Sequence, residues 1–201
     1  MTQDKTAMRF CPSCGENVDT YILERMGDSF GEIEEEYCCV HCGIKVYDSC
    51  QREIKPADSI LVSDDSSMIR GLLHDLLIEN NLSKKVVSSR DGSDFITLFS
   101  KSISEKLPFS LVVLDVAMPV LNGINAAIAM RAIEKALNMN PTPILFFTAS
   151  KCDENFKKVL SYCNPAQYVN KGVSSTPDLL ASRIGRVVKY LLKESQNASV
   201  P

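Results

Sequence analysis

From residue 59 onward, short apolar runs alternate with helical patterns, and this alternation restricts the possible fold more than any other feature of the chain. Apolar runs predict strands at 60–62, 85–89, 109–114, 143–147 and 167–170. Helical spacing predicts helices at 68–77, 93–106, 123–137 and 178–193, and a capping box over Ser150–Asp153 predicts the start of another helix. Five strand–helix units predict an α/β fold, a doubly wound five-stranded parallel sheet with helices on both faces.

Polar residues follow four of the predicted strands. Asp64 and Asp65 follow the first, Asp115 the third, Thr148 the fourth and Lys171 the fifth. Because the carboxyl ends of parallel strands lie at one edge of a sheet, we expect these side chains to converge. Three close carboxylates repel one another, so we expect a hard dication such as Mg²⁺ among them. The lysine and the threonine hydroxyl would complete a site for a phosphoryl group.

Residues 59–193, about two-thirds of the chain, resemble a response-regulator receiver domain of the CheY type. The resemblance rests on Asp64-Asp65-Ser66 with Arg70, on Asp115-Val-Ala-Met-Pro-Val-Leu-Asn-Gly123, on Thr148-Ala-Ser150 and on Lys171. It implies a flavodoxin-like sheet with the strand order 2-1-3-4-5.

The resemblance also implies a phosphoacceptor and a metal site. Asp115 is the expected phosphoacceptor. Asp65, Asp115 and the backbone carbonyl of Ala117 are the expected Mg²⁺ ligands, and Asp64 is expected to support the metal through water.

Further roles are implied for three side chains on later strands. Thr148 and Lys171 are expected to hold phosphoryl oxygens. Tyr168 lies where the family carries an aromatic residue that shifts with the threonine on activation. In this chain Gly172 follows the lysine, where the family usually has proline. We therefore expect a trans peptide or a differently shaped loop there.

Two Cys-x₂-Cys-Gly knuckles, Cys11–Gly15 and Cys39–Gly43, indicate a zinc ribbon in the N-terminal segment. The alternative is a redox or disulfide pair, and Cys38 or His41 could replace a ligand. A segment of about 50 residues has too small a core to be stable without a metal. The expected Zn²⁺ ligands are Cys11, Cys14, Cys39 and Cys42.

These features divide the chain into a zinc-ribbon-like module (1–50), a polar linker (51–58), the receiver (59–193) and a flexible tail (194–201). Residues 1–57 carry 6 Lys and Arg against 11 Asp and Glu, a net charge of −5. This acidity disfavours nucleic-acid binding and favours protein docking. One hypothesis is that the ribbon packs near a basic stripe on the last helix. The alternative is a solvated basic face. The stripe consists of Arg183, Arg186, Lys189 and Lys193.

We interpret the chain as a cytoplasmic response regulator without a signal peptide or a membrane-spanning segment. A sensor histidine kinase would phosphorylate Asp115, and protein–protein contacts would carry the signal to an unidentified partner. Beyond slow self-hydrolysis of the phosphoryl group, we expect no enzymatic activity. The alternatives are a nucleic-acid-binding regulator that acts through the ribbon and a phosphorylation-independent scaffold. The sequence leaves open whether the protein forms a homodimer.

Overall fold

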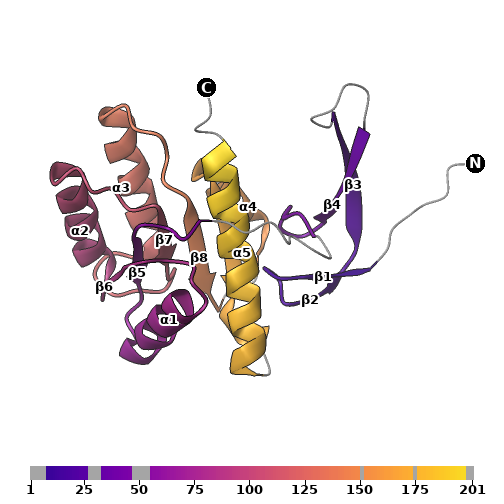
Figure 1. Cartoon of the computed structure of the whole chain (residues 1–201), viewed down its shortest axis with the longest axis horizontal. Helices are drawn as coiled ribbons and strands as arrows, with labels where there is room; N and C mark the ends of the chain where they lie inside the picture. Colours follow the sequence, from indigo (N-terminus) through magenta and orange to yellow (C-terminus); the bar gives the residue numbers. More distant parts are fainter. Residues whose placement is uncertain (1–7, 27–32, 47–54, 150–151, 174–175, 198–201) are drawn as a thin grey trace, which may run out of the picture.

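The computed structural model describes residues 8–26, 33–46, 55–149, 152–173 and 176–197. Its largest unit is a five-stranded parallel sheet in the order β6-β5-β7-β8-β9 (Figure 1), which confirms the predicted order 2-1-3-4-5. The strands of this sheet are β5 (Ile60–Ser63), β6 (Val86–Ser89), β7 (Leu111–Leu114), β8 (Ile144–Thr148) and β9 (Ala166–Asn170).

Helices connect consecutive strands and cover both faces of the sheet (Figure 1). The chain reverses direction across the sheet after β6, so right-handed crossovers place α1 on the face opposite to α2, α3 and α4. The helices are α1 (Ser67–Glu79), α2 (Gly92–Ser104), α3 (Gly123–Ala136), α4 (Glu154–Tyr162) and α5 (Pro177–Asn197). A short 3-10 turn, η1 (Lys171–Val173), joins β9 to the segment before α5.

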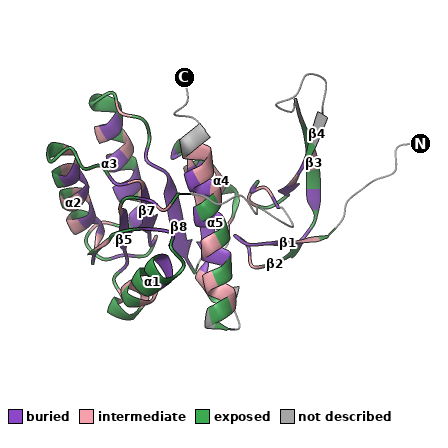
Figure 2. Cartoon of the chain, in the orientation of Figure 1, coloured by how far each residue is buried: buried purple, intermediate pink, exposed green. Residues whose placement is uncertain are grey.

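The central strands consist of apolar residues because the sheet is covered on both sides. All residues of β5, β7 and β8 are buried (Figure 2). The carboxyl ends of these strands lie at one edge of the sheet, where the apolar strand residues are followed by polar ones. The fold therefore brings together the residues that follow these strands.

The N-terminal segment forms two small antiparallel sheets beside α4 and α5 (Figure 1). We call the described residues 8–46 the ribbon. One sheet pairs β1 (Arg9–Cys11) with β2 (Glu16–Val18), and the other pairs β3 (Thr20–Met26) with β4 (Ile33–Cys39). Its buried apolar residues, including Val18 and Ile44, form one continuous cluster with the core of the receiver.

Three local features differ from the expectations. Helix α4 begins at Glu154 and its cap is Asp153, whose carboxylate accepts the Phe156 N–H at 2.7 Å, so the predicted capping box was one turn too early. Ser150 lies outside the described residues. Helix α5 continues to Asn197, so the first residues of the predicted tail are helical.

The end of the predicted linker is bound to the receiver. Ala57 pairs in parallel with Ser83, donates its N–H to the Leu82 carbonyl at 2.9 Å and accepts the Lys84 N–H at 2.9 Å. Residues 51–54 of the linker lie outside the described residues. Ala57 of the predicted linker is therefore paired with the loop before β6.

Candidate functional site

The carboxyl edge of the sheet holds the three predicted aspartates. Asp64 and Asp65 follow β5, Asp115 follows β7, and a ligand oxygen from each lies within 4.8 Å of the others. Asp64 and Asp115 are buried and Asp65 is exposed. We call Asp64, Asp65, Asp115 and the adjoining Lys171 the carboxylate site.

The backbone around Asp115 requires a glycine at the start of α3. A Cβ built on Gly123 would lie 1.9 Å from the carbonyl oxygen of Asp115, so a larger residue could not fit there. Asn122 caps α3 by accepting the Asn125 N–H at 2.9 Å. This close approach of helix and strand fixes the loop that carries the aspartate.

Lys171 joins the two buried aspartates. Its Nζ lies 2.7 Å from Asp64 Oδ2 and 3.0 Å from Asp115 Oδ1. Burial raises the pKa of Asp64, and the charge of Asp115 adds to this, while the ammonium group of Lys171 and the Ser66 N–H oppose it. Three carboxylates and one ammonium leave two negative charges, and the oxygen ligands are those that Mg²⁺ prefers. The side chains present therefore fit a magnesium ion.

The structure places Thr148 at the end of β8, where it is 1 % exposed. Ala117 lies in the exposed loop after β7, two residues from Asp115. Tyr168 is buried in β9, opposite Phe146 of β8. The functional roles of these residues stay predictions.

The four predicted zinc ligands form a second cluster. The Sγ atoms of Cys11 and Cys42 lie 3.6 Å apart, and those of Cys14 and Cys39 lie 3.8 Å apart. Both distances exceed the S–S bond of about 2.05 Å, so neither pair is a disulfide. Four Zn–S bonds of about 2.3 Å at tetrahedral angles separate sulfurs by about 3.8 Å. The cluster therefore has the spacing that a tetrahedral zinc ion needs. Cys38 and His41 are not members of it.

The thiols of this cluster perturb one another. Hydrogen bonds with the neighbouring sulfurs raise the pKa of Cys11 and Cys42, and they lower the pKa of Cys14 and Cys39. A dication bound among them would displace thiol protons, as metal binding to cysteine generally requires.

The first knuckle, Cys11–Gly15, is docked on the receiver through contacts that the sequence did not predict. Arg183 of α5 donates to the carbonyls of Pro12 and Ser13 at 2.8 and 2.9 Å. The Asn170 N–H of β9 donates to the Ser13 carbonyl at 3.0 Å. The hydroxyl of Tyr168 lies 3.1 Å from Cys14 Sγ.

These contacts correct the expected basic stripe on the last helix. Arg183 is 1 % exposed and binds backbone carbonyls, so it does not belong to a solvated basic face. One ion pair between the two units has its cation on the ribbon and its anion on α5, the reverse of the expected arrangement. In this pair Lys45 of the ribbon lies 3.7 Å from Glu194 of α5. The ribbon does pack on this helix, but through a buried guanidinium. General attraction between an acidic module and basic side chains does not explain the docking.

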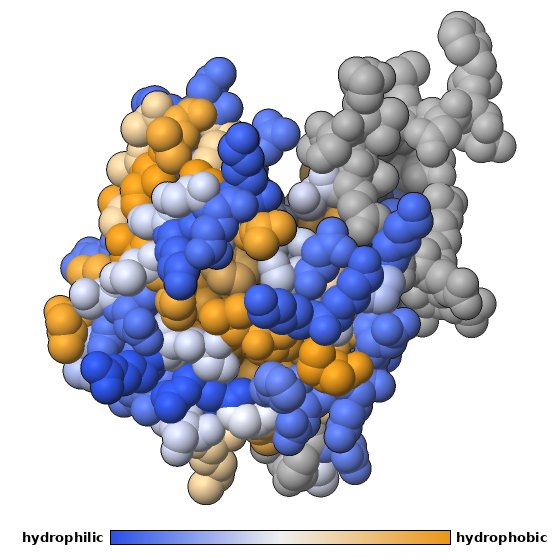
Figure 3. Space-filling view, turned by 60° about the vertical axis from the view of Figure 1, so that its left-hand side comes forward, coloured by the Kyte–Doolittle hydropathy of each residue, from blue (hydrophilic) through white to orange (hydrophobic). Residues whose placement is uncertain are grey.

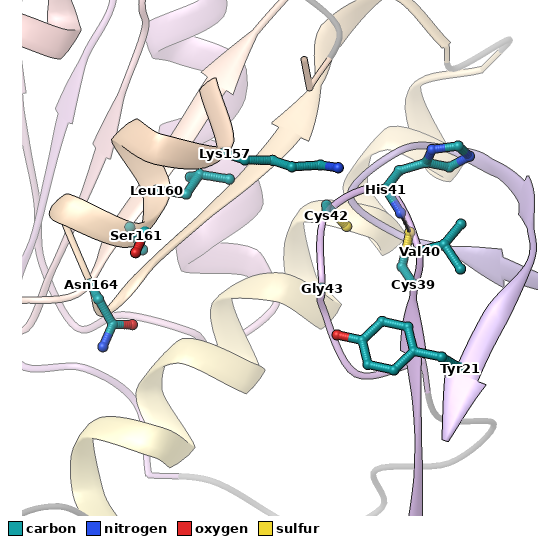
Figure 4. Close-up of a pocket in the computed structure, with 11 residues that line it drawn as sticks. Tyr21, Cys39, Val40, His41, Cys42, Gly43, Lys157, Leu160, Ser161 and Asn164 are labelled. Carbon is teal, nitrogen blue, oxygen red and sulfur yellow. Dashed lines mark hydrogen bonds between the residues drawn. The ribbon is translucent and has the colours of Figure 1, made fainter. Parts of the chain in front are cut away.

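The second knuckle, Cys39–Gly43, faces α4 across an open cavity of about 370 Å³ (Figure 4). Tyr21 and His41 lie on the ribbon side of this cavity, and Lys157 and Leu160 lie on the helix side. The two knuckles therefore differ. The first is in direct contact with β9 and α5, and the second is separated from α4 by solvent-accessible space.

Apolar side chains are also exposed on the receiver, where Figure 3 shows them between hydrophilic ones. The most exposed large apolar residues in the described part of the chain are Val120, at 87 %, and Met68, at 78 %. Val120 follows Asp115 by five residues, and Met68 follows Asp65 by three. Among the described helices, none has the length and apolar character needed to cross a bilayer.

Comparisons with known proteins agree with this arrangement. The family model "Response regulator receiver domain" matches residues 60–183. A protein-glutamate methylesterase/protein-glutamine glutaminase of Methanococcus maripaludis is 26 % identical over 141 residues, which are 70 % of this chain and 36 % of that protein. The hybrid signal transduction histidine kinase I of Dictyostelium discoideum is 26 % identical over 140 residues, which are 70 % of this chain and 8 % of the kinase. The chain thus spans only a minor part of these relatives.

Solved structures with a similar fold include the response regulator domain of Thermotoga maritima CheB. It has a TM-score of 0.53 and 23 % identity, and the match covers 68 % of this chain and 96 % of that domain. The receiver domain of the Arabidopsis thaliana histidine kinase CKI1, solved with Mg²⁺ and BeF₃⁻, has a TM-score of 0.52 and 19 % identity. That match covers 66 % of this chain and 90 % of the receiver domain. At these identities the likeness supports the fold alone.

Proposed function

Because this chain belongs to the response regulator receiver domain family, we propose that Asp115 accepts a phosphoryl group from a sensor histidine kinase. The observation that supports this best is the pairing of Lys171 with both Asp64 and Asp115. It places a cation beside the carboxylate that would attack phosphorus. Phosphoryl transfer depends mainly on positioning and charge neutralisation, and this site offers both.

Mg²⁺ is the proposed metal of the carboxylate site. Asp65, Asp115 and the Ala117 carbonyl would bind it, and Asp64 would support it. The metal would neutralise the carboxylates and the incoming phosphoryl oxygens. Lys171 and Thr148 would contact those oxygens from the protein side. Tyr168 would respond together with Thr148.

Zn²⁺ is the proposed metal of the ribbon, held by the four clustered cysteines. Its role there is structural, because four protein ligands leave no open coordination position. The free thiols of the cluster fit a reducing compartment such as the cytoplasm.

For the output we propose protein–protein contact and no enzymatic turnover by this chain. The esterase and kinase activities of the relatives belong to proteins of which this chain matches 36 % and 8 %.

Intact-mass spectrometry after incubation with Mg²⁺ and a small acyl phosphate tests the phosphoacceptor. The wild type should gain the mass of one phosphoryl group, and Asp115→Ala should gain none. Asp75→Ala is the matched control, because Asp75 is an exposed residue of α1. Removal of Mg²⁺ by a chelator should also prevent the gain. A wild type that stays unmodified would favour a phosphorylation-independent scaffold.

A further inference from the structure

We propose that the receiver domain completes the four-cysteine metal site of the ribbon. Tyr168 of β9 donates a hydrogen bond to the sulfur of Cys14, so that a bound Zn²⁺ holds the first knuckle on the surface formed by β9 and α5. This inference rests on the proposed zinc binding. It goes beyond it by making the site a joint product of two domains.

The first argument is the geometry at Tyr168. Its hydroxyl lies 3.1 Å from Cys14 Sγ, and its side chain is 2 % exposed. The ring is fixed by an edge contact with Phe156 of α4 at 5.9 Å, and Phe156 makes a similar contact with Phe146 of β8 at 5.5 Å. A thiolate bound to a metal has no proton to give, so the tyrosine must be the donor. A donor in this position can orient a ligand and adjust its electron density.

The second argument is the charge of Arg183. Zn²⁺ bound by four thiolates carries a net charge of −2, and burying such a centre is costly unless charge of the opposite sign lies near it. The guanidinium of Arg183 is buried and binds the two carbonyls between the ligands Cys11 and Cys14. A buried cation that faces this loop suits a dianionic metal centre better than four neutral thiols.

The third argument is the difference between the knuckles. Tyr168, Arg183 and the Asn170 N–H all act on the first knuckle. The second knuckle faces a cavity of about 370 Å³ and obtains an N–H to Cys39 Sγ from within its own loop, at His41. The receiver therefore supports only half of the ligand set directly. By linkage, contacts that hold the docked knuckle increase metal affinity, and the metal stabilises docking.

Replacement of zinc by Co²⁺ in the full chain tests this inference, because cobalt–thiolate charge-transfer bands report on the ligand sulfurs. Tyr168→Phe removes the hydroxyl and keeps the ring. Loss of a hydrogen bond to one thiolate raises the energy of its lone pairs, so the band should move to longer wavelength. Release of Co²⁺ to a chelator should become about tenfold faster, the usual effect of losing such an outer contact.

Tyr162→Phe is the matched control, because it removes a hydroxyl from a tyrosine that is 64 % exposed at the end of α4. It should leave both the band and the release rate at their wild-type values. Far-ultraviolet circular dichroism of each variant shows whether it is folded. Arg183→Lys gives an independent test, since lysine lacks the planar guanidinium whose Nε and Nη2 donate separately to the two carbonyls, and it too should release Co²⁺ faster.

The outcomes separate the inference from the proposed zinc site. If the wild type binds one Co²⁺ through thiolates, but Tyr168→Phe and Arg183→Lys keep its spectrum and release rate, the receiver does not complete the site. A wild type that binds neither Co²⁺ nor Zn²⁺ would reject the zinc site and the inference with it. A band shift in Tyr168→Phe, with faster release in both interface variants and neither effect in Tyr162→Phe, would support the inference.

Discussion

One added methyl group, in Gly15→Ala, should weaken the docking of the ribbon on the receiver. Gly15 has φ +79°, and a Cβ at this position would lie 2.6 Å from Arg183 Cζ and 2.7 Å from its Nη2. Gly43 occupies the equivalent place in the second knuckle with φ +72°, and its Cβ would meet only the Tyr21 hydroxyl, at 3.9 Å. The two substitutions therefore impose the same backbone conformation on alanine. Only one of them reaches into the interface.

The expected magnitudes follow from this comparison. A left-handed conformation costs a non-glycine residue about 1–2 kcal/mol, and both variants incur it. Gly15→Ala must also displace the buried guanidinium of Arg183, which donates to two carbonyls at 2.8 and 2.9 Å. A hydrogen bond from a charged group contributes about 1.5–3 kcal/mol. Loss of one of the two bonds makes Gly15→Ala about 1.5–3 kcal/mol more destabilising than Gly43→Ala.

Urea denaturation of the zinc-loaded full chain, followed by far-ultraviolet circular dichroism, measures this difference. Native-state hydrogen exchange localises it, because the Gly15 N–H donates to the Cys11 carbonyl at 2.8 Å and the Gly43 N–H donates to the Cys39 carbonyl at 2.8 Å. In Gly15→Ala, faster exchange should extend to the Asn170 N–H of β9. Equal destabilisation by the two variants would refute the reasoning, since it would mean that Arg183 does not hold the first knuckle.

Three further outcomes are expected. Lys171→Met should slow phosphoryl acceptance from a small donor about a hundredfold. Calorimetric titration should find tighter Mg²⁺ binding, because the three carboxylates lose their neighbouring cation. An unchanged rate of phosphoryl acceptance would contradict the role of the lysine. Chelation of zinc should make the ribbon sensitive to protease while the receiver stays resistant, and mass spectrometry of the fragments maps the cleavage sites. A ribbon that stays resistant would contradict the proposed role of the metal. Burial raises the pKa of Cys163 above its usual 9.0, so the unfolded chain loses this proton first as the pH rises. The stability of the wild type should therefore fall more steeply between pH 8 and 10 than that of Cys163→Ala, measured by urea midpoints, and parallel curves would contradict it.

The sequence was sufficient to predict the sheet because its strands are buried on both faces. The apolar runs that became β5, β7 and β8 contain few polar residues, so their positions were clear and their order followed the resemblance to receivers. The carboxylate site was also predictable. Parallel strands end at one edge, and the aspartates come directly after them. The clustering of the four cysteines followed from the spacing of two matched knuckles.

The docking of the ribbon was only a hypothesis, because it depends on contacts between residues more than 150 positions apart. Arg183 was assigned to a basic stripe from its charge, although Leu180, Ile184 and Val187 place it on the apolar face of α5 by helical spacing. That spacing was the available signal. The contact between Tyr168 and Cys14 could not be predicted from the local sequence pattern of either segment. The cap of α4 was misplaced because Ser150 and Asp153 are both good caps.

The position of the ribbon limits how a partner protein can bind this receiver. The Asn170 N–H lies at the end of β9, the edge strand of the sheet, and it is bound by the Ser13 carbonyl of the first knuckle. Arg183 of α5 is bound by the same loop. A protein that contacts this part of β9 and α5 must therefore bind the ribbon as well or displace it. Displacement would expose the buried guanidinium of Arg183 and the hydroxyl of Tyr168 beside Cys14. The free energy needed to displace the ribbon depends on how firmly the first knuckle is held. Zinc occupancy should therefore determine whether a partner binds the ribbon together with the receiver or displaces it.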